Sequence, residues 1–231
     1  MTARQLPLLI PTVPAYDAAS FLQAESNEAA RTWLGRTELW PDRRLALWGE
    51  ADRGKTHLLQ IWAARTGADV VDGKLLSDFP GVTSEAGAAV DDADRADEAA
   101  LLHLLNTARD LGRTVLLVGR VPPARWSVAL PDLDSRLRAI TAVEVEAPDD
   151  NLLRRLLLLW LAERRLVAHE TLHNRLLLRL PRSSEVLRAA VARLDRDALT
   201  SQVRTVTPGM VREALDAVTG NGGPSTSSAA H

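Results

Sequence analysis

The sequence contains no cysteine among its 231 residues. This absence excludes a disulfide-linked scaffold, a thiol nucleophile and a zinc site held by thiolates. An excess of positive charge is missing as well, because the formal net charge is -2. No general electrostatic attraction to nucleic acid is therefore expected, and a role on DNA would need a local basic patch or a bridging partner.

Long apolar runs are also absent. The longest wholly apolar run covers residues 156–162, far short of the roughly 20 residues that a membrane-spanning helix needs. Residues 1–5 lack the apolar region of a secretory signal peptide. With 46% hydrophobic and 25% charged residues, the composition is that of a globular protein with a substantial core. We therefore expect a soluble, cytoplasmic protein with no membrane span.

Segments typical of strands alternate with helical segments up to about residue 147. The expected strands are residues 43–48, 68–71, 88–90, 114–118 and 139–145, and the expected helices are residues 18–34, 55–64 and 97–111. This alternation predicts an α/β fold in which helices cover both faces of a parallel sheet. Residues 149–165, 171–180, 183–194 and 208–218 then have helical spacing, with no strand between them.

The chain is thus expected to have four parts. Residues 1–16, with three prolines, are interpreted as an extended arm, and residues 17–147 as the α/β core. Residues 148–219 are expected to form a small all-helical lid. Residues 220–231, rich in glycine, serine, proline and alanine, predict a disordered tail.

A phosphate-loop motif lies between the first expected strand and the helix that follows it. The string GEADRGKT, from Gly49 to Thr56, matches G-x-x-x-x-G-K-[ST]. Gly49 and Gly54 would let the backbone turn its N–H groups toward phosphate oxygens, at the positive end of a helix dipole. Lys55 would reach the β- and γ-phosphates and the Thr56 hydroxyl would ligate Mg²⁺. Two carboxylates inside the loop oppose a polyanion, so the affinity is left open.

An acid pair follows the short apolar strand at residues 88–90. Asp91 and Asp92 come directly after it, which downstream of a phosphate loop is typical of a Walker B element. In that interpretation Asp91 holds Mg²⁺ and Asp92 orients an attacking water. Acid pairs also begin loops and cap helices, so this assignment depends on the phosphate loop upstream.

Three further strings carry a resemblance to a known family. They are PPARW at residues 122–126, LPDLDSRL at residues 130–137 and APDD at residues 147–150. With the two nucleotide motifs, they resemble the Hda family, DnaA-related AAA+ proteins involved in regulatory inactivation of the bacterial replication initiator. The resemblance runs from about residue 5 to residue 215. It implies an AAA+ P-loop core followed by the helical lid, with ADP or ATP and Mg²⁺ as cofactors.

The resemblance also implies roles for individual residues. Arg136 falls in the arginine-finger motif and would act in trans on a neighbour's nucleotide. Arg182 looks like the sensor-2 arginine, although a shift of one turn would place Glu185 there instead. Asn27 lies in the family's first box, near the adenine, unless its segment is simply an amphipathic helix on the core. His57 would also contact the nucleotide.

One position departs from the family's pattern. The polar sensor-1 residue at the end of the fourth strand is replaced by Val118, which cannot hydrogen-bond to a phosphate or a water. We expect weak intrinsic ATPase activity, and whether the chain is itself an enzyme is left open.

The expected N-terminal arm and the C-terminal end of the sequence indicate which partners the chain binds. Residues 5–9 resemble the sliding-clamp-binding pentapeptide, in which Gln5 anchors a polar pocket while Leu6, Leu8 and Leu9 fill an apolar groove. The implied partners are DnaA and the DNA polymerase III sliding clamp, with DNA contacted indirectly through the clamp; a homo-oligomer is left open. After residue 215 the sequence offers only a polar tail, so the helix-turn-helix with which DnaA reads origin DNA is not expected.

A rival motif, H-E-x-x-H, runs from His169 to His173. On a helix it can hold zinc, with the glutamate as a general base. The chain has no cysteine, its only later histidine lies in the tail, and Glu185, the nearest plausible third ligand, lies in another expected helix. A surface helix start is therefore the better interpretation. Three functions stay open: a regulator that promotes hydrolysis of ATP bound to DnaA, a DNA-binding initiator paralogue, and, least favoured, a zinc hydrolase.

Overall fold

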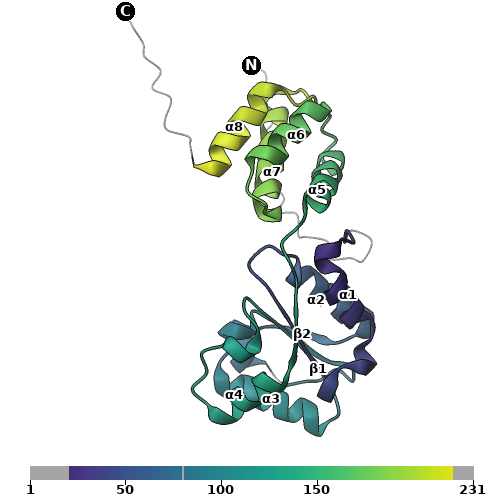
Figure 1. Ribbon diagram of the computed structural model, residues 1–231, viewed down its shortest axis with the longest axis vertical. Coiled ribbons are helices and arrows are strands. Elements are labelled where there is room, and N and C mark those ends of the chain that lie inside the picture. Colours follow the sequence, from purple (N-terminus) through teal and green to yellow (C-terminus); the bar gives the residue numbers. More distant parts are fainter. Residues whose placement is uncertain (1–20, 80, 221–231) are drawn as a thin grey trace, which may run out of the picture.

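The computed structural model describes residues 21–79 and 81–220. The predicted clamp-binding residues Gln5, Leu6, Leu8 and Leu9 lie outside the described residues, and so does nearly all of the predicted tail. Along the described parts, strands and helices alternate up to Glu144 and only helices follow from Asp150 (Figure 1).

Five parallel strands form the central sheet, in the order β2-β3-β4-β1-β5. The strands are β1 (Arg44–Trp48), β2 (Asp69–Asp72), β3 (Gly87–Asp91), β4 (Thr114–Gly119) and β5 (Thr141–Glu144). The parallel register aligns Trp48 with Gly119 and Asp72 with Asp91. All five strands therefore end at the same edge of the sheet, which is where α/β proteins bind ligands.

Helices pack on both faces of this sheet. The helices are α1 (Glu28–Gly35), α2 (Lys55–Thr66), α3 (Glu98–Asp110) and α4 (Pro131–Ala139). Leu116 packs in the apolar cluster of α1 and α2, whereas the next residue, Leu117, packs in the cluster of α3 and α4. This follows because successive side chains of a strand point to opposite faces. The predicted fold class, a parallel sheet covered by helices, is confirmed.

The start of α1 differs from the sequence-based expectation. The helix predicted from residue 18 begins only at Glu28, after the short 3-10 helix η1 (Glu25–Asn27). The Asn27 amide nitrogen donates to the Leu22 carbonyl at 3.0 Å, and its oxygen accepts from the Ala24 N–H at 3.1 Å. These bonds hold the preceding segment in a non-helical turn, as expected of an asparagine that bonds nearby backbone.

Helix α4 and five short 3-10 helices were not predicted. Helix α4 begins with Pro131 at its first turn, where the missing proline N–H costs nothing, and it ends at Ala139, which shortens the expected fifth strand. The 3-10 helices are η2 (Thr37–Leu39), η3 (Pro41–Arg43), η4 (Gly73–Asp78), η5 (Ala93–Arg95) and η6 (Pro123–Arg125).

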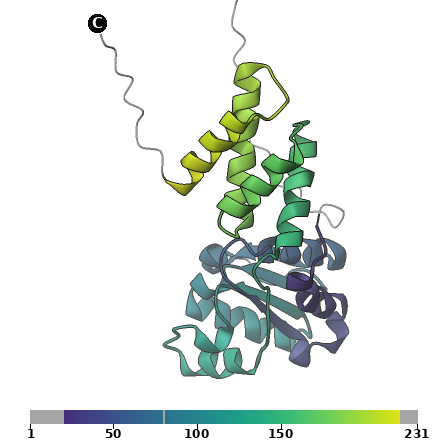
Figure 2. The same cartoon turned by 45° about the horizontal axis from the view of Figure 1, so that its top comes forward.

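Four helices make up the lid: α5 (Asp150–Glu163), α6 (Glu170–Arg179), α7 (Ser184–Ser201) and α8 (Pro208–Thr219). They enclose an apolar core of their own that includes Leu157, Leu176 and Val191. Asp149 and Ser183 cap α5 and α7 through side-chain oxygens, and each such cap contributes about 1 kcal/mol. Figure 1 shows the lid at one end of the molecule and α3 and α4 at the other, and Figure 2 shows the lid as a separate layer above the sheet.

No helix within residues 21–79 and 81–220 is both long enough and apolar enough to cross a membrane.

Candidate functional site

The loop between β1 and α2 curls through three residues with positive φ. They are Gly49 at φ +152, Asp52 at φ +63 and Gly54 at φ +85. A Cβ atom added to Gly49 would lie 2.6 Å from the carbonyl oxygen of Val145, so this position accepts only glycine without a shift of the backbone. Helix α2 begins directly after Gly54. The loop thus delivers backbone N–H groups and a helix N-terminus to one place, as an anion site requires.

Lys55 and Thr56 start α2 at this edge of the sheet. The Lys55 ammonium donates to the Glu50 carbonyl at 2.7 Å, which folds the side chain back over the loop. Burial lowers the pKa of Lys55, and the charge of Arg120 lowers it further, against the opposing charge of Asp91. The Thr56 hydroxyl donates to Asp91 Oδ2 at 2.8 Å. The structure therefore brings together the hydroxyl and the carboxylate that were predicted to hold Mg²⁺, and hard oxygen ligands of this kind suit that ion.

Glu50, one of the two acidic residues of the loop, has a cationic partner. Arg53 pairs with Glu50 at 2.9 Å and with Glu144, at the end of β5, at 3.3 Å. The Arg53 guanidinium also donates to the Val145 carbonyl at 3.4 Å. Arg53 thus offsets the charge of Glu50 and ties the loop to the edge of the sheet, which reduces the repulsion of a bound polyanion.

The lid contacts the loop at Asp52. The Ser184 hydroxyl, in the first turn of α7, donates to the Asp52 carbonyl at 2.6 Å. A hydrogen bond between the Asp52 and Glu185 side chains raises the pKa of Glu185, and the nearby Asp52 charge adds to this shift. A second link joins the Arg155 guanidinium of α5 to the Gln23 carbonyl at 2.7 Å. The lid is therefore bound to the phosphate loop and to the segment before α1.

Arg182 lies beside this contact, in an ion pair with Asp150 at 3.0 Å in which both side chains are exposed. Ser184 and Glu185, rather than Arg182, contact the loop. Nucleotide contact by Arg182 stays a prediction.

Asp92 follows the end of β3 in a left-handed conformation at φ +46. Its carboxylate lies 3.1 Å from the Lys74 ammonium and 3.6 Å from the Arg95 guanidinium. Its backbone N–H donates to Asp91 Oδ1 at 3.1 Å, which helps to orient the Asp91 carboxylate. The orientation of a water by Asp92 stays a prediction, and the two cations hold this carboxylate toward η4 and η5.

The segment before α1 borders the loop. The Phe21 ring meets the His57 ring edge-on at 5.0 Å, and Phe21 is also the nearest group to Gly54, 3.6 Å from an added Cβ. Asn27 is buried and its amide bonds the turn before α1. The Ser26 carbonyl accepts from the Glu146 N–H at 3.0 Å, which fixes this segment against the chain after β5. The structure brings His57 to the flank of the loop and gives Asn27 a role in shaping that flank.

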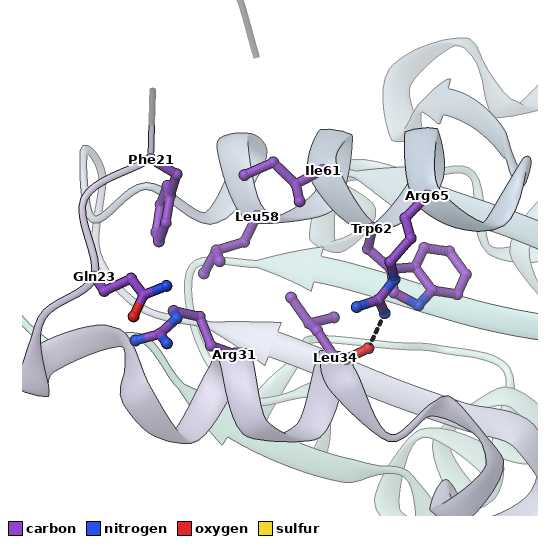
Figure 3. Close-up of a pocket in the computed structure, with 8 residues that line it drawn as sticks. All are labelled: Phe21, Gln23, Arg31, Leu34, Leu58, Ile61, Trp62 and Arg65. Atoms are coloured by element: carbon purple, nitrogen blue, oxygen red, sulfur yellow. Dashed lines mark hydrogen bonds between the residues drawn. The ribbon is translucent and has the colours of Figure 1, made fainter. Parts of the chain in front are cut away.

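A cavity of about 180 Å³ lies between α1 and α2 next to this segment (Figure 3). Its lining residues are Phe21, Gln23, Arg31, Leu34, Leu58, Ile61, Trp62 and Arg65. The Arg65 guanidinium donates to the Leu34 carbonyl across it. Sequence reasoning missed this cavity, although the spacing of residues 58, 61, 62 and 65 places them on one face of α2.

Two other predicted positions, Val118 and Arg136, lie away from the contacts described above. Val118 is 1% exposed and packs in the sheet core, so it offers no polar group to the site.

Arg136 is partly exposed on α4, in an ion pair with Asp132 at 3.2 Å. Burial lowers the pKa of Arg44, and the charge of nearby Arg136 lowers it further.

This places Arg136 near the start of β1, at the opposite end of the strand from Gly49. The five residues of β1 separate the two ends by roughly 15 Å. Arg136 therefore lies far from the chain's own phosphate loop, and its action on another molecule's nucleotide stays a prediction.

The H-E-x-x-H motif starts α6. His169 caps this helix, and its Nδ1 accepts from the Thr171 N–H at 3.3 Å. Burial lowers the pKa of His173. Over the part of the chain that the structure describes, no three His, Cys, Asp or Glu side chains are grouped to hold a metal ion. The motif acts there as a helix start.

No protein-family model matches the sequence, and no curated protein sequence matches it. Solved structures are similar in fold. Domain III of the Thermotoga maritima replication initiation protein DnaA superposes with a TM-score of 0.73 at 20% identity, over 90% of this chain and 99% of that one. A replication initiator DnaA bound to AMPPCP and single-stranded DNA has a TM-score of 0.64 at 17% identity, over 82% of this chain and 69% of that one.

The Thermotoga maritima RuvB Holliday junction branch migration motor has a TM-score of 0.61 at 14% identity, over 83% of this chain and 66% of that one. At these identities the likeness establishes the fold alone, and it does not single out the Hda family. The chain has the AAA+ fold of DnaA domain III.

Proposed function

We propose that the chain binds an adenine nucleotide with Mg²⁺ at residues 49–56 and regulates the initiation of chromosomal replication in the cytoplasm. The observation that carries the proposal is the contact between Thr56 and Asp91 beside Lys55, at the mouth of a loop that opens a helix. These residues offer the oxygen ligands, the ammonium and the backbone donors that a magnesium–nucleotide complex needs.

The fit to a nucleotide has two further supports. AMPPCP is bound in two of the similar DnaA structures, one of them from Aquifex aeolicus. Among the described residues, the Lys55 ammonium is held by one backbone carbonyl, which a phosphate oxygen can replace without breaking an ion pair. A bound Mg²⁺ would neutralise phosphate charge and add to the field from Lys55, while Thr56 and Asp91 would hold the ion.

Hydrolysis of the chain's own nucleotide is expected to be slow. Val118 has no polar group, and Asp92 is engaged by Lys74 and Arg95. We therefore assign the main activity to Arg136, which lies at the far end of β1 from its own loop. Inserted at the nucleotide of DnaA, this guanidinium would stabilise the charge that develops during ATP hydrolysis.

The partners follow from the family resemblance. Gln5, Leu6, Leu8 and Leu9 would dock on the DNA polymerase sliding clamp, which would bring the protein to DNA without direct base contacts. DnaA loaded with ATP would then be the substrate complex on which Arg136 acts.

The test is hydrolysis of DnaA-bound ATP, measured with and without this protein on clamp-loaded DNA. Arg136→Ala is expected to abolish the stimulation while the midpoint of thermal unfolding and clamp binding stay unchanged. Arg138→Ala is the matched control, because Arg138 lies on the same helix and forms the same kind of i,i+4 ion pair, with Asp134 at 2.9 Å. Undiminished stimulation by Arg136→Ala would assign Arg136 to structure alone.

The clamp contact is tested separately. The double change Gln5→Ala and Leu6→Ala should remove capture by immobilised clamp without altering thermal unfolding. Capture at the wild-type level would remove the clamp from the proposal.

A further inference from the structure

Arg120 occupies a position between the two nucleotide motifs. Gly119, the last residue of β4, aligns with Trp48 at the end of β1, so the next residues along the two strands, Arg120 and Gly49, leave the sheet side by side. On the other flank of β4, Leu117 aligns with Val90, one residue before the acid pair. Arg120 therefore emerges between the first residue of the phosphate loop and the carboxylates that follow β3.

The backbone of Arg120 is fixed there. Its N–H donates to Asp94 Oδ2 at 3.1 Å, which ties the end of β4 to η5. The other oxygen of that carboxylate, Oδ1, is buried and has no hydrogen-bond partner among the described residues. The bond from the Arg120 N–H to the half-buried Asp94 restrains the turn that carries Arg120.

The side chain of Arg120, by contrast, is exposed. Within residues 21–79 and 81–220 its guanidinium makes no hydrogen bond and no ion pair. Arg120 leaves the sheet beside Gly49, the first residue of the loop that ends at Lys55 and Thr56. Two cations held near each other repel, and an anion placed between them relieves the repulsion.

Beside Arg120, the described side chains at the ends of β3 and β4 offer the terminal phosphate no donor to add to Lys55. Val118, on the same strand, is apolar and buried. Asp92 is an acceptor that is itself engaged by Lys74 and Arg95. A guanidinium offers a planar fork of N–H groups that matches two phosphate oxygens, and it stays charged at all relevant pH values.

We infer that Arg120 binds the terminal phosphate of a nucleoside triphosphate held by the same chain, and thereby makes the site prefer ATP over ADP. This inference rests on the proposed binding of nucleotide at residues 49–56. Arg120 would act as a specificity-determining residue, because ADP lacks the phosphate that it contacts, and it would take over at this edge the polar role that Val118 cannot fill.

The experiment is calorimetric titration of Mg-ATP and, separately, of Mg-ADP into wild-type, Arg120→Ala and Arg120→Lys proteins. Arg125→Ala is the matched control, since Arg125 is an exposed arginine in the adjacent η6. Arg120→Ala is expected to weaken ATP binding by about 10- to 100-fold, the usual effect of losing charge-assisted hydrogen bonds. ADP binding should change by less than about twofold, Arg120→Lys should fall between, and the control should match wild type.

The outcomes separate the inference from the function on which it rests. An unchanged ratio of ATP to ADP affinity in Arg120→Ala overturns the role of Arg120, whether both affinities are retained or both fall together. If the wild-type protein binds neither nucleotide, the proposed function fails and the inference fails with it. Normal ADP binding by every variant shows that each is folded, so a selective loss of ATP affinity supports the inference.

Discussion

Gly49 is the position where one added methyl group tests the geometry of the phosphate loop most sharply. In Gly49→Ala the new Cβ would lie 2.6 Å from the Val145 carbonyl oxygen. The Val145 carbonyl cannot retreat freely, because it accepts a hydrogen bond from Arg53 at 3.4 Å and the Val145 N–H donates to the Trp48 carbonyl at 2.8 Å. The backbone itself, at φ +152, is also one that side chains other than glycine rarely adopt.

The cost has two parts. Holding a non-glycine residue in such a conformation costs about 1–3 kcal/mol. Relieving the overlap with the Val145 carbonyl adds about 1–3 kcal/mol, which is the usual cost of an extra methyl group in a packed core. Gly67→Ala is the matched control, because Gly67 has φ +78 but no atom within 4 Å of an added Cβ. Its cost should be about 1–2 kcal/mol, the backbone contribution alone.

Thermal unfolding followed by circular dichroism measures the difference. For a chain of this size 1 kcal/mol corresponds to about 2–4 °C, so Gly49→Ala should lower the midpoint by about 4–24 °C, and by more than Gly67→Ala does. Equal midpoints for the two variants would refute the close approach of Gly49 to Val145.

Two predictions concern pH. The hydrogen bond with Asp52 raises the pKa of Glu185, so the Glu185 carboxyl keeps its proton to higher pH in the folded protein than in the unfolded chain. The stabilisation from this pair is therefore lost as pH rises through the raised pKa. Glu185→Gln keeps a donor without a charge and should flatten this part of the profile of unfolding midpoint against pH; an identical profile would contradict the pairing. Burial would raise the pKa of Asp69, but hydrogen bonds from residues 83–84 outweigh it and lower the pKa. The stabilisation from the ionised Asp69 is present above the ordinary carboxyl pKa and is lost as pH falls through the lowered value. Asp69→Asn should therefore lower the unfolding midpoint near neutral pH and have little effect in acid. Equal losses at neutral and acidic pH would contradict the lowered pKa of Asp69.

The strand–loop–helix of the phosphate site was predictable because its signals are local. Gly49 and Gly54 flank a loop between an apolar strand and a helix, and Lys55 and Thr56 follow at fixed spacing. Helix α4 escaped prediction because it is only nine residues long and buries just Leu133 and Leu137, too few for a clear period.

Contacts between distant parts of the chain could not be predicted from local patterns. Arg53 pairs with Glu144 across 91 positions, so the loop carries less uncompensated charge than its sequence suggests. Ser184 bonds Asp52 across 132 positions, and that contact brings Ser184 and Glu185, rather than Arg182, to the loop. Arg120 was overlooked because its position depends on the register between β1 and β4.

The central claim is that residues 49–56 hold the phosphates of an adenine nucleotide. Calorimetric titration of ADP and of ATP with magnesium into wild-type protein and into Lys55→Ala tests it most directly. A saturable heat with wild type, much weakened in Lys55→Ala while the unfolding midpoint is retained, is the predicted result. The absence of any binding heat for either nucleotide with folded wild-type protein would contradict the account.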